Sequence, residues 1–113
     1  MVNRSKNITL ADKVTLANTF GTRLKGLLGR KSLEERESLI LTNSSSIHTL
    51  FMHFPLDIIF LDKKQRVIRI IKEMKPFRFS PFVFKAKMIV ELAAGKIEKT
   101  KTEVGDSLDI LLD

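Results

Sequence analysis

The sequence predicts an α+β fold with mostly antiparallel strands, and three observations support this class. The chain has 113 residues, 43% hydrophobic and 29% charged, as expected for one globular domain. Many short apolar segments are separated by turn-forming residues, which predicts strands. One segment clearly repeats its apolar residues with the period of a helix. We therefore expect residues 1–113 to form a single domain, with residues 1–7 as a loose N-terminal tail.

The first half of the chain contains the clearest helix signal. A strand is expected over residues 8–16, with a turn near its middle. Between residues 20 and 28, apolar residues recur at i, i+4, i+7 and i+8, which predicts a short amphipathic helix. Gly29 fits the end of this helix because glycine tolerates a left-handed conformation. A short buried strand is expected at residues 39–41.

The second half is expected to be richer in strands. Pro55 separates two apolar segments, 47–54 and 56–61, because proline lacks the N–H that a central strand donates. The elements expected after them are a hairpin loop at 62–65 joining strands 57–61 and 66–72, an irregular loop at 76–81, a strand at 87–92, a turn at 93–95, a helical turn at 96–99 and a strand at 107–112.

Composition excludes several classes of site. Cysteine is absent, which excludes disulfides, thiolate metal sites and thiol nucleophiles. The two histidines, His48 and His53, are five residues apart, so a continuous strand would place them on opposite sides. We expect no metal site and no cofactor. The longest apolar run, residues 58–61, is far shorter than the roughly 20 residues of a membrane span. With no secretory signal evident, the sequence predicts a cytoplasmic protein without a membrane span.

Positive charge is concentrated in one segment. The chain carries a formal net charge of +7 and has a pI near 9.9, and such a field attracts anions. Within residues 63–87, nine Lys and Arg residues face Glu73 alone, a net +8. Four phenylalanines lie among these cations, and aromatic faces with nearby cations are what single-stranded nucleic acid requires. The residues assigned to this alternative site are Phe77, Arg78, Phe79, Lys85 and Lys87.

A structural interpretation of the same segment is favoured over nucleic-acid binding. In this interpretation Phe82 and Phe84 belong to the core and the lysines form a solvated surface. No RNP-type or KH-type motif is present to support an RNA-binding fold.

Asp57 interrupts an otherwise apolar strand face. A carboxylate in that setting pairs with a cation, accepts hydrogen bonds or stays protonated with a raised pKa. A structural role, capping a turn or binding an arginine, is favoured over a catalytic or ligand-binding one. A hydrolase with His48 as general base and Asp57 as its orienting carboxylate remains an alternative, although the Gly-x-Ser-x-Gly elbow of many hydrolases is missing.

Five motifs, in order, resemble those of one family. They are RLKGLLGR (23–30), SIHTLFM (46–52), FPLDIIFLD (54–62), ELAAG (91–95) and VGD (104–106). Together they are similar to the domain of unknown function 192, also called uncharacterised protein family 0127. The resemblance implies one compact α+β domain with a largely antiparallel, β-barrel-like sheet. It places the family's signature positions at Arg23, Gly26, Arg30, His48, Thr49, Met52, Asp57, Glu91 and Gly95.

These positions suggest a binding module without established catalysis. The predicted site is a cleft lined by Arg23, Arg30, His48, Thr49 and Asp57. The arginines would bind a small anion or an anionic group of a partner protein, His48 and Thr49 would orient it, and Asp57 would fix an arginine or the imidazole.

Overall fold

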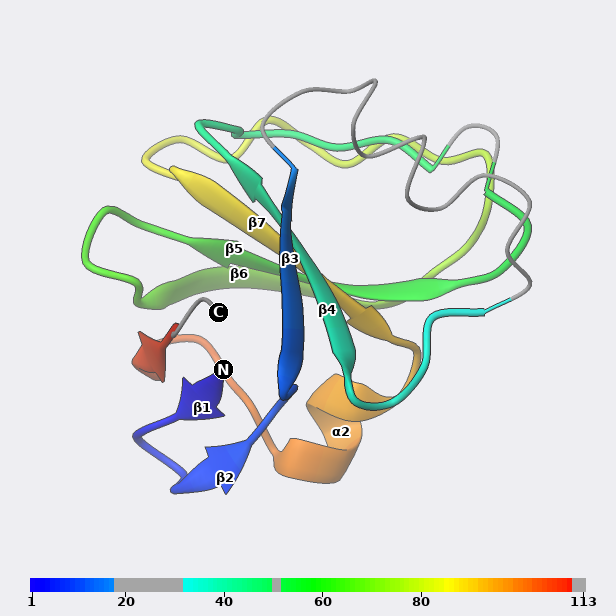
Figure 1. The fold of residues 1–113 in the computed structure, drawn as a ribbon. Helices are drawn as coiled ribbons and strands as arrows, with labels where there is room; N and C mark the ends of the chain where they lie inside the picture. The colour runs from blue at the N-terminus through cyan, green and yellow to red at the C-terminus, as the bar shows by residue number, and fades with distance from the viewer. Residues whose placement is uncertain (18–31, 50–51, 111–113) are drawn as a thin grey trace.

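Two sheets and a short helix make up the part of the chain that the computed structural model describes, residues 1–17, 32–49 and 52–110. The larger sheet contains β3 (Lys13–Ala17), β4 (Glu37–Thr42), β5 (Leu56–Leu61), β6 (Val67–Met74) and β7 (Met88–Ala93). The smaller sheet contains β1 (Val2–Asn3), β2 (Ile8–Thr9) and β8 (Leu108–Asp109). The described helix is α2 (Lys96–Thr100), below the larger sheet in Figure 1.

The larger sheet has the order β3-β4-β7-β5-β6. β3 pairs with β4 in parallel, and the other neighbours pair antiparallel. The predicted hairpin around residues 62–65 is confirmed as the β5–β6 turn, and the predicted helical turn at 96–99 as α2. The α+β, mostly antiparallel class is therefore confirmed. The sheet stays open, with β3 and β6 at its edges, rather than closing into a barrel.

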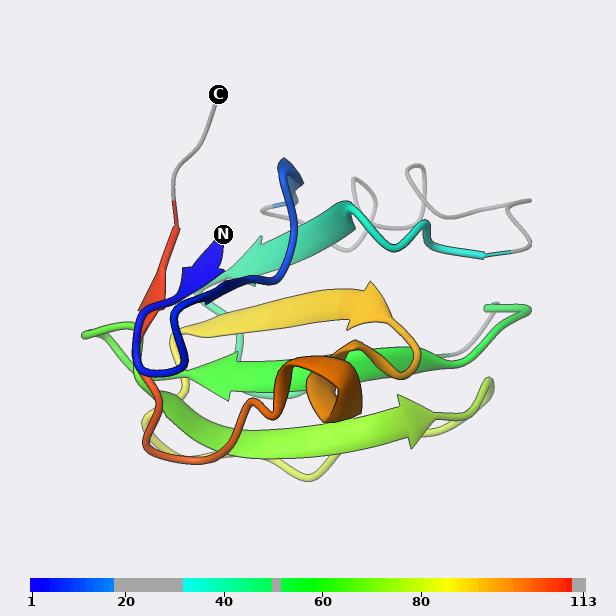
Figure 2. The same cartoon turned by 90° about the horizontal axis from the view of Figure 1, so that it is seen from below.

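The sheet is buried on both faces by two apolar clusters. Along β5, Leu56, Ile58 and Phe60 contribute to one cluster, while Ile59 and Leu61 contribute to the other. This division follows from the two-residue period of a strand. All six residues of β5 are buried, which explains its continuous apolar sequence. In Figure 2, α2 lies against one side of this sheet.

The smaller sheet brings the two ends of the chain together. Val2 pairs with Thr9 of β2 and with Asp109 of β8. The expectation that residues 1–7 form a loose tail is wrong, because Met1 is only 6% exposed and Asn3 is fully buried. The tail is ordered by partners about a hundred residues away in the sequence, which no local pattern reveals.

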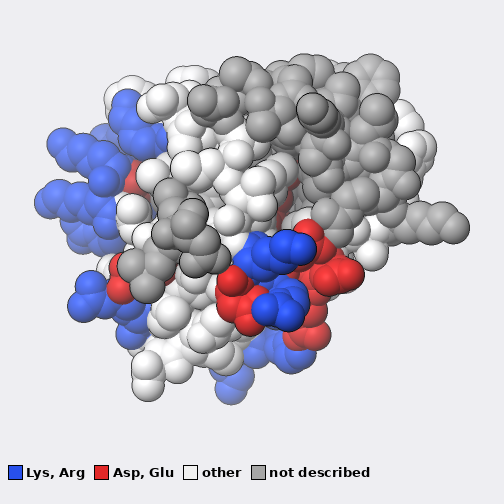
Figure 3. All heavy atoms as spheres, in the orientation of Figure 1, with Lys and Arg blue, Asp and Glu red and all other residues white. Residues whose placement is uncertain are grey.

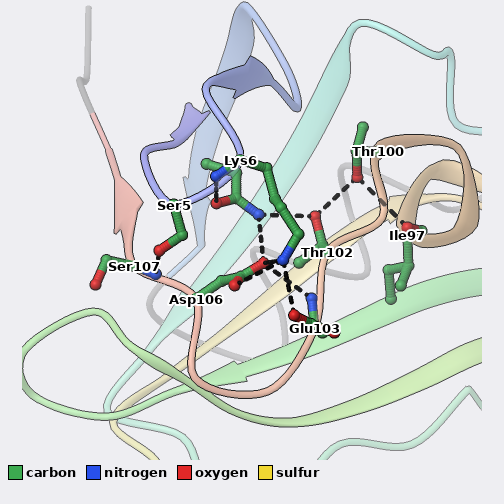
Figure 4. Close-up of polar contacts among 9 residues, drawn as sticks. Ser5, Lys6, Ile97, Thr100, Thr102, Glu103, Asp106 and Ser107 are labelled. Carbon is green, nitrogen blue, oxygen red and sulfur yellow. Dashed lines mark hydrogen bonds and ion pairs between the residues drawn. The ribbon is translucent and has the colours of Figure 1, made fainter.

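A buried polar network fixes this junction of the termini. The Asn3 side-chain amide donates to Thr102 Oγ1 at 3.1 Å and to Asp106 Oδ2 at 2.9 Å. Lys6 Nζ donates to Asp106 Oδ1 at 3.1 Å, and the Thr100 and Thr102 hydroxyls lie 2.8 Å apart. Figure 4 shows Lys6, Thr102 and Asp106 pointing toward one another between the N-terminal turn and the 100–107 segment. Because its members bond to one another, we assign this cluster a structural role.

Two elements expected from the sequence do not appear among the described helices and strands. The amphipathic helix predicted over residues 20–28 lies outside the described residues. The apolar segment 47–54 forms no strand in its described part, where a single bridge joins His48 to Phe79.

Candidate functional site

A hollow of about 520 Å³ lies where the β5–β6 hairpin turns and β7 begins. Most of its lining comes from the hairpin turn at residues 62–66 and from residues 82–87, with Ser45 beneath. Phenylalanine, lysine and arginine side chains dominate the lining. We call this site the basic aromatic pocket.

The aromatic residues of the pocket are exposed. Phe82 is 72% exposed and Phe84 is 76% exposed, whereas Val83 between them is buried. The favoured sequence interpretation, which placed both phenylalanines in the core, is therefore wrong. The segment alternates its side chains, and Val83 occupies the inward position. A Phe-Val-Phe alternation carries no local information about which set faces inward.

The backbone under these phenylalanines is held by hydrogen bonds. The Val83 N–H donates to the Ser45 carbonyl at 2.8 Å, and the Ser45 hydroxyl donates to the Ala86 carbonyl at 3.0 Å. The Lys87 N–H donates to the Leu61 carbonyl at 2.8 Å. A ligand that stacked on the phenylalanines would therefore meet an ordered loop, and ordering this backbone would cost little free energy on binding.

Five cations surround the aromatic pair. They are Lys63, Lys64, Arg66, Lys85 and Lys87. None of them forms an ion pair within the described part of the chain. Their charge is therefore available to an anion in solvent.

Asp62 is the acidic residue in the pocket lining. Its Oδ1 atom accepts the backbone N–H groups of Lys64 at 2.8 Å and Arg66 at 3.0 Å. Burial raises the pKa of this carboxyl, but the hydrogen bonds from Arg66 and Lys64 and their positive charges outweigh burial and lower the pKa. Asp62 thus shapes the hairpin turn as an ionised group bonded to backbone.

Several cations elsewhere in the described structure are paired with acids. Lys72 lies 2.6 Å from Glu98, and Lys96 lies 3.3 Å from Glu35, which also binds Lys99. In Figure 3, blue and red atoms alternate near α2, whereas blue atoms dominate the side that carries the β5–β6 turn. Within the described residues, five cations without an ion pair thus gather at the basic aromatic pocket.

A second pair of exposed phenylalanines follows β6. Phe77 is 59% exposed and Phe79 is 71% exposed, with the exposed Arg78 between them. The Phe79 ring centroid lies 5.9 Å from that of His48, with the rings tilted by 57°. His48 thus lies beside one of the aromatic residues predicted for nucleic-acid binding.

Thr49 holds this second aromatic pair in place. It is fully buried, and its Oγ1 donates to the Lys75 carbonyl at 2.6 Å while accepting the Arg78 N–H at 2.8 Å. The Thr49 N–H donates to the Arg78 carbonyl, and the Thr49 carbonyl accepts the Phe77 N–H. The polar atoms of Thr49 are used by the loop at 75–78, which gives this residue a structural role.

Asp57 binds two backbone groups. Its Oδ1 accepts the Glu73 N–H at 2.8 Å, and its Oδ2 accepts the Ile97 N–H at 2.7 Å. Asp57 is fully buried on the sheet face that carries Ile59 and Leu61. The carboxylate therefore fixes a β-bulge in β6 and the first turn of α2, as the structural interpretation expected.

The predicted cleft is brought together only in part. His48 and Thr49 are neighbours on a loop whose buried Ile47 belongs to the cluster on the opposite sheet face from Asp57. Neither hydrogen bond that Asp57 accepts comes from His48. Arg23 and Arg30 lie outside the described residues, so the anion-binding cleft stays a prediction.

The described ranges contain neither a metal-ligand cluster nor a membrane-spanning helix. Within residues 1–17, 32–49 and 52–110, no three His, Asp or Glu residues form a group suited to a metal ion. In the same part of the chain, no helix is both long and apolar enough to cross a membrane.

The fold and the site together define a small, basic, mixed-sheet domain with an aromatic surface. The DUF192 family, described as an uncharacterized ACR, matches residues 1–110, and the chain belongs to this family. The resemblance noted in the sequence motifs is thereby confirmed.

Archaeal relatives cover almost the whole chain. A UPF0127 protein of Pyrococcus furiosus is 36% identical over 96% of this chain and 96% of its own length. Another, from Pyrococcus horikoshii, is 33% identical with the same coverage. A third, from Thermococcus sibiricus, is 32% identical over 96% of this chain and 73% of its own.

Two crystal structures share the fold. A protein of unknown function from Novosphingobium aromaticivorans gives a TM-score of 0.80 at 23% identity, covering 94% of this chain and 79% of its own. A protein from Sinorhizobium meliloti, named as a candidate transcription regulator, gives 0.75 at 20% identity, covering 96% and 88%. At these identities the likeness concerns the fold alone.

Proposed function

We propose that this protein binds single-stranded nucleic acid through the basic aromatic pocket. The observation that carries the proposal is the position of Phe82 and Phe84, more than 70% exposed in a hollow ringed by five cations without ion pairs. Base–aromatic stacking contributes about 1–3 kcal/mol per base, and cations neutralise the phosphates beside it.

The pocket favours a single strand over a duplex. Stacking on a phenylalanine requires a base whose face is free, and bases inside a duplex already stack on their neighbours. Single-stranded recognition of this kind needs no base-specific hydrogen bonds. We therefore expect weak sequence preference and strong salt dependence.

The basic aromatic pocket is also a better candidate for a binding site than the predicted anion cleft. In the cleft, the polar atoms of Thr49 and Asp57 are bonded to backbone groups. In the pocket, the cationic side chains have no such partners. A small anion alone would engage these cations but would leave the two phenylalanines without a contact.

Fluorescence anisotropy with a labelled oligothymidylate tests the proposal. We expect the logarithm of the binding constant to fall linearly with the logarithm of salt concentration, with a slope of about −0.7 per phosphate neutralised. The five cations of the pocket contribute at most about −3.5 to this slope. The paired substitution Lys63→Glu and Lys64→Glu is expected to weaken binding and to reduce this slope by about 1.4.

Matched variants separate the pocket from general surface effects. Phe82→Ala with Phe84→Ala is expected to weaken binding roughly 5- to 150-fold, the equivalent of one stacked base. Val104→Ala removes a 59% exposed apolar side chain elsewhere, and Lys13→Glu reverses an exposed charge on β3. Both controls should change the dissociation constant less than twofold.

Two results would refute the proposal. One is the absence of saturable oligonucleotide binding at low salt. The other is binding of phosphatidylserine-containing vesicles, but not of oligonucleotides, with loss of vesicle binding in the Phe82→Ala and Phe84→Ala variant. The second result would assign the phenylalanines to a membrane surface.

A further inference from the structure

We infer that residues 75–87 form a track for one continuous single strand, running from Phe77 and Phe79 to the basic aromatic pocket. This inference rests on the proposed function and extends it from a pocket to a path of defined length. The inference starts from the four exposed phenylalanines of this segment, which is the connection between β6 and β7.

Sheet topology makes this connection run the full length of the strands. β6 and β7 each pair antiparallel with β5, so they run parallel to each other. The chain leaving the end of β6 must therefore return along the length of the strands before β7 begins. Figures 1 and 2 show the connection doing so, which places the two phenylalanine pairs toward opposite ends of it.

The connection is supported along its length by residues 45–49. Three alternate residues of this segment bond to it: Thr49 to Arg78, Ile47 to Ser80, and Ser45 to Val83. The Ser80 N–H donates to the Ile47 carbonyl at 2.8 Å, and the Ile47 N–H donates to the Ser80 hydroxyl at 2.9 Å. These bonds lock the backbone, so the exposed rings project from a fixed support.

Each end of the track combines aromatic rings with cations. Lys75 and Arg78 flank Phe77 at the β6 end, and both are exposed without an ion pair in the described chain. The pocket supplies the cations at the other end. A strand with bases stacked at both ends would thus have its phosphates neutralised at both ends.

The length of the track limits the site size. Phe77 and Phe84 are seven residues apart, so their Cα atoms are separated by at most about 25 Å. Stacked nucleotides advance about 3.4 Å each, which gives an upper limit of about seven nucleotides. This value lies within the roughly 4–16 nucleotides covered by single-strand-binding domains of similar size.

A length series tests the track. Anisotropy with oligothymidylates of about 2 to 12 nucleotides should show affinity that increases up to about seven nucleotides. For longer strands, the affinity should increase only in proportion to the number of positions at which the strand can bind. The variant Phe77→Ala with Phe79→Ala should leave dinucleotide binding within twofold. The same variant should weaken octanucleotide binding at least about fivefold.

Pocket variants provide the opposite pattern. Phe82→Ala with Phe84→Ala should weaken both the dinucleotide and the octanucleotide, and Val104→Ala should weaken neither. All four phenylalanines are exposed, so each variant should keep the urea midpoint of the parent, which confirms that the fold is intact.

The failure of the track and the failure of the pocket give different results. If binding stops strengthening at two nucleotides and the Phe77→Ala, Phe79→Ala variant binds the octanucleotide like the parent, the track is overturned and the pocket stands. If no oligonucleotide binds at any length, the proposed function fails and the track fails with it.

Discussion

Replacement of Asp57 by alanine provides a sharp test of the structural role of this carboxylate. The substitution removes the acceptor for two backbone N–H groups, those of Glu73 and Ile97. A buried donor left without a partner costs about 1–3 kcal/mol. The Ile97 donor is buried and the Glu73 donor is partly buried, so we expect a total loss of about 2–5 kcal/mol.

This loss is a large fraction of the stability of a typical domain, about 5–15 kcal/mol. Urea unfolding at neutral pH measures it as a lower midpoint with an unchanged slope. Asp57→Asn keeps one acceptor oxygen, so we expect a smaller loss than for Asp57→Ala. Asp12→Ala serves as the control, because it removes an exposed ion pair with Arg36 whose contribution is below about 1 kcal/mol.

A small loss of stability in Asp57→Ala would contradict the structural role of this carboxylate. If Asp57→Ala costs less than about 1 kcal/mol, the two hydrogen bonds are not the reason for a buried carboxylate in β5. If that small loss of stability accompanies a large loss of ligand binding, Asp57 acts in binding, by fixing an arginine or the imidazole as the predicted cleft requires.

Three further predictions concern other parts of the fold. Phe82→Ala with Phe84→Ala should change the free energy of unfolding by less than about 0.5 kcal/mol per site, because both rings are exposed. A loss of about 3–5 kcal/mol per site in urea titrations would instead indicate that both rings are buried in the core. Burial raises the pKa of Asp106, but bonds from Asn3, the Glu103 N–H and Lys6 lower it overall. The contribution of ionised Asp106 to stability is therefore complete above the usual pKa of about 4. It is lost as the pH falls through the lowered pKa of the folded state. Unfolding titrations between neutral and acidic pH should therefore show a weaker pH dependence of stability for Asp106→Asn than for the parent. Gly95 has φ 95° with open space around its Cβ position, and Gly95→Ala should cost about 1–2 kcal/mol from backbone strain alone in thermal unfolding.

The parts of the fold that the sequence predicted well are those with local signals. Turn-forming residues at 62–65 between two apolar segments predicted the β5–β6 hairpin, and Gly95 preceded a short helical turn. The two-residue strand β1 has no such signal, because its stability comes from pairing with β8 at the other end of the chain. A strand of two residues is too short to show a period.

The site was predicted less well than the fold, for a related reason. The anomaly of a carboxylate in an apolar strand identified Asp57 correctly as a group that needs partners. Its partners are backbone N–H groups of Glu73 and Ile97, and every residue but proline has such a group, so the sequence could not identify them. For Phe82 and Phe84, the deciding fact was that Val83 faces inward, which tertiary contacts with Ser45 determine.

The position of β7 in the centre of the larger sheet has a consequence during synthesis. β3–β4 and β5–β6 are two separate pairs that only β7 joins. β7 ends at Ala93, 32 residues after the end of β5, and ribosomes add about 5–20 residues per second. For about 2–6 s, a nascent chain therefore carries two strands with unpaired inner edges, β4 and β5, both rich in apolar residues. The yield of folded protein in cells should accordingly depend on chaperone capacity and on the rate of translation through residues 62–93.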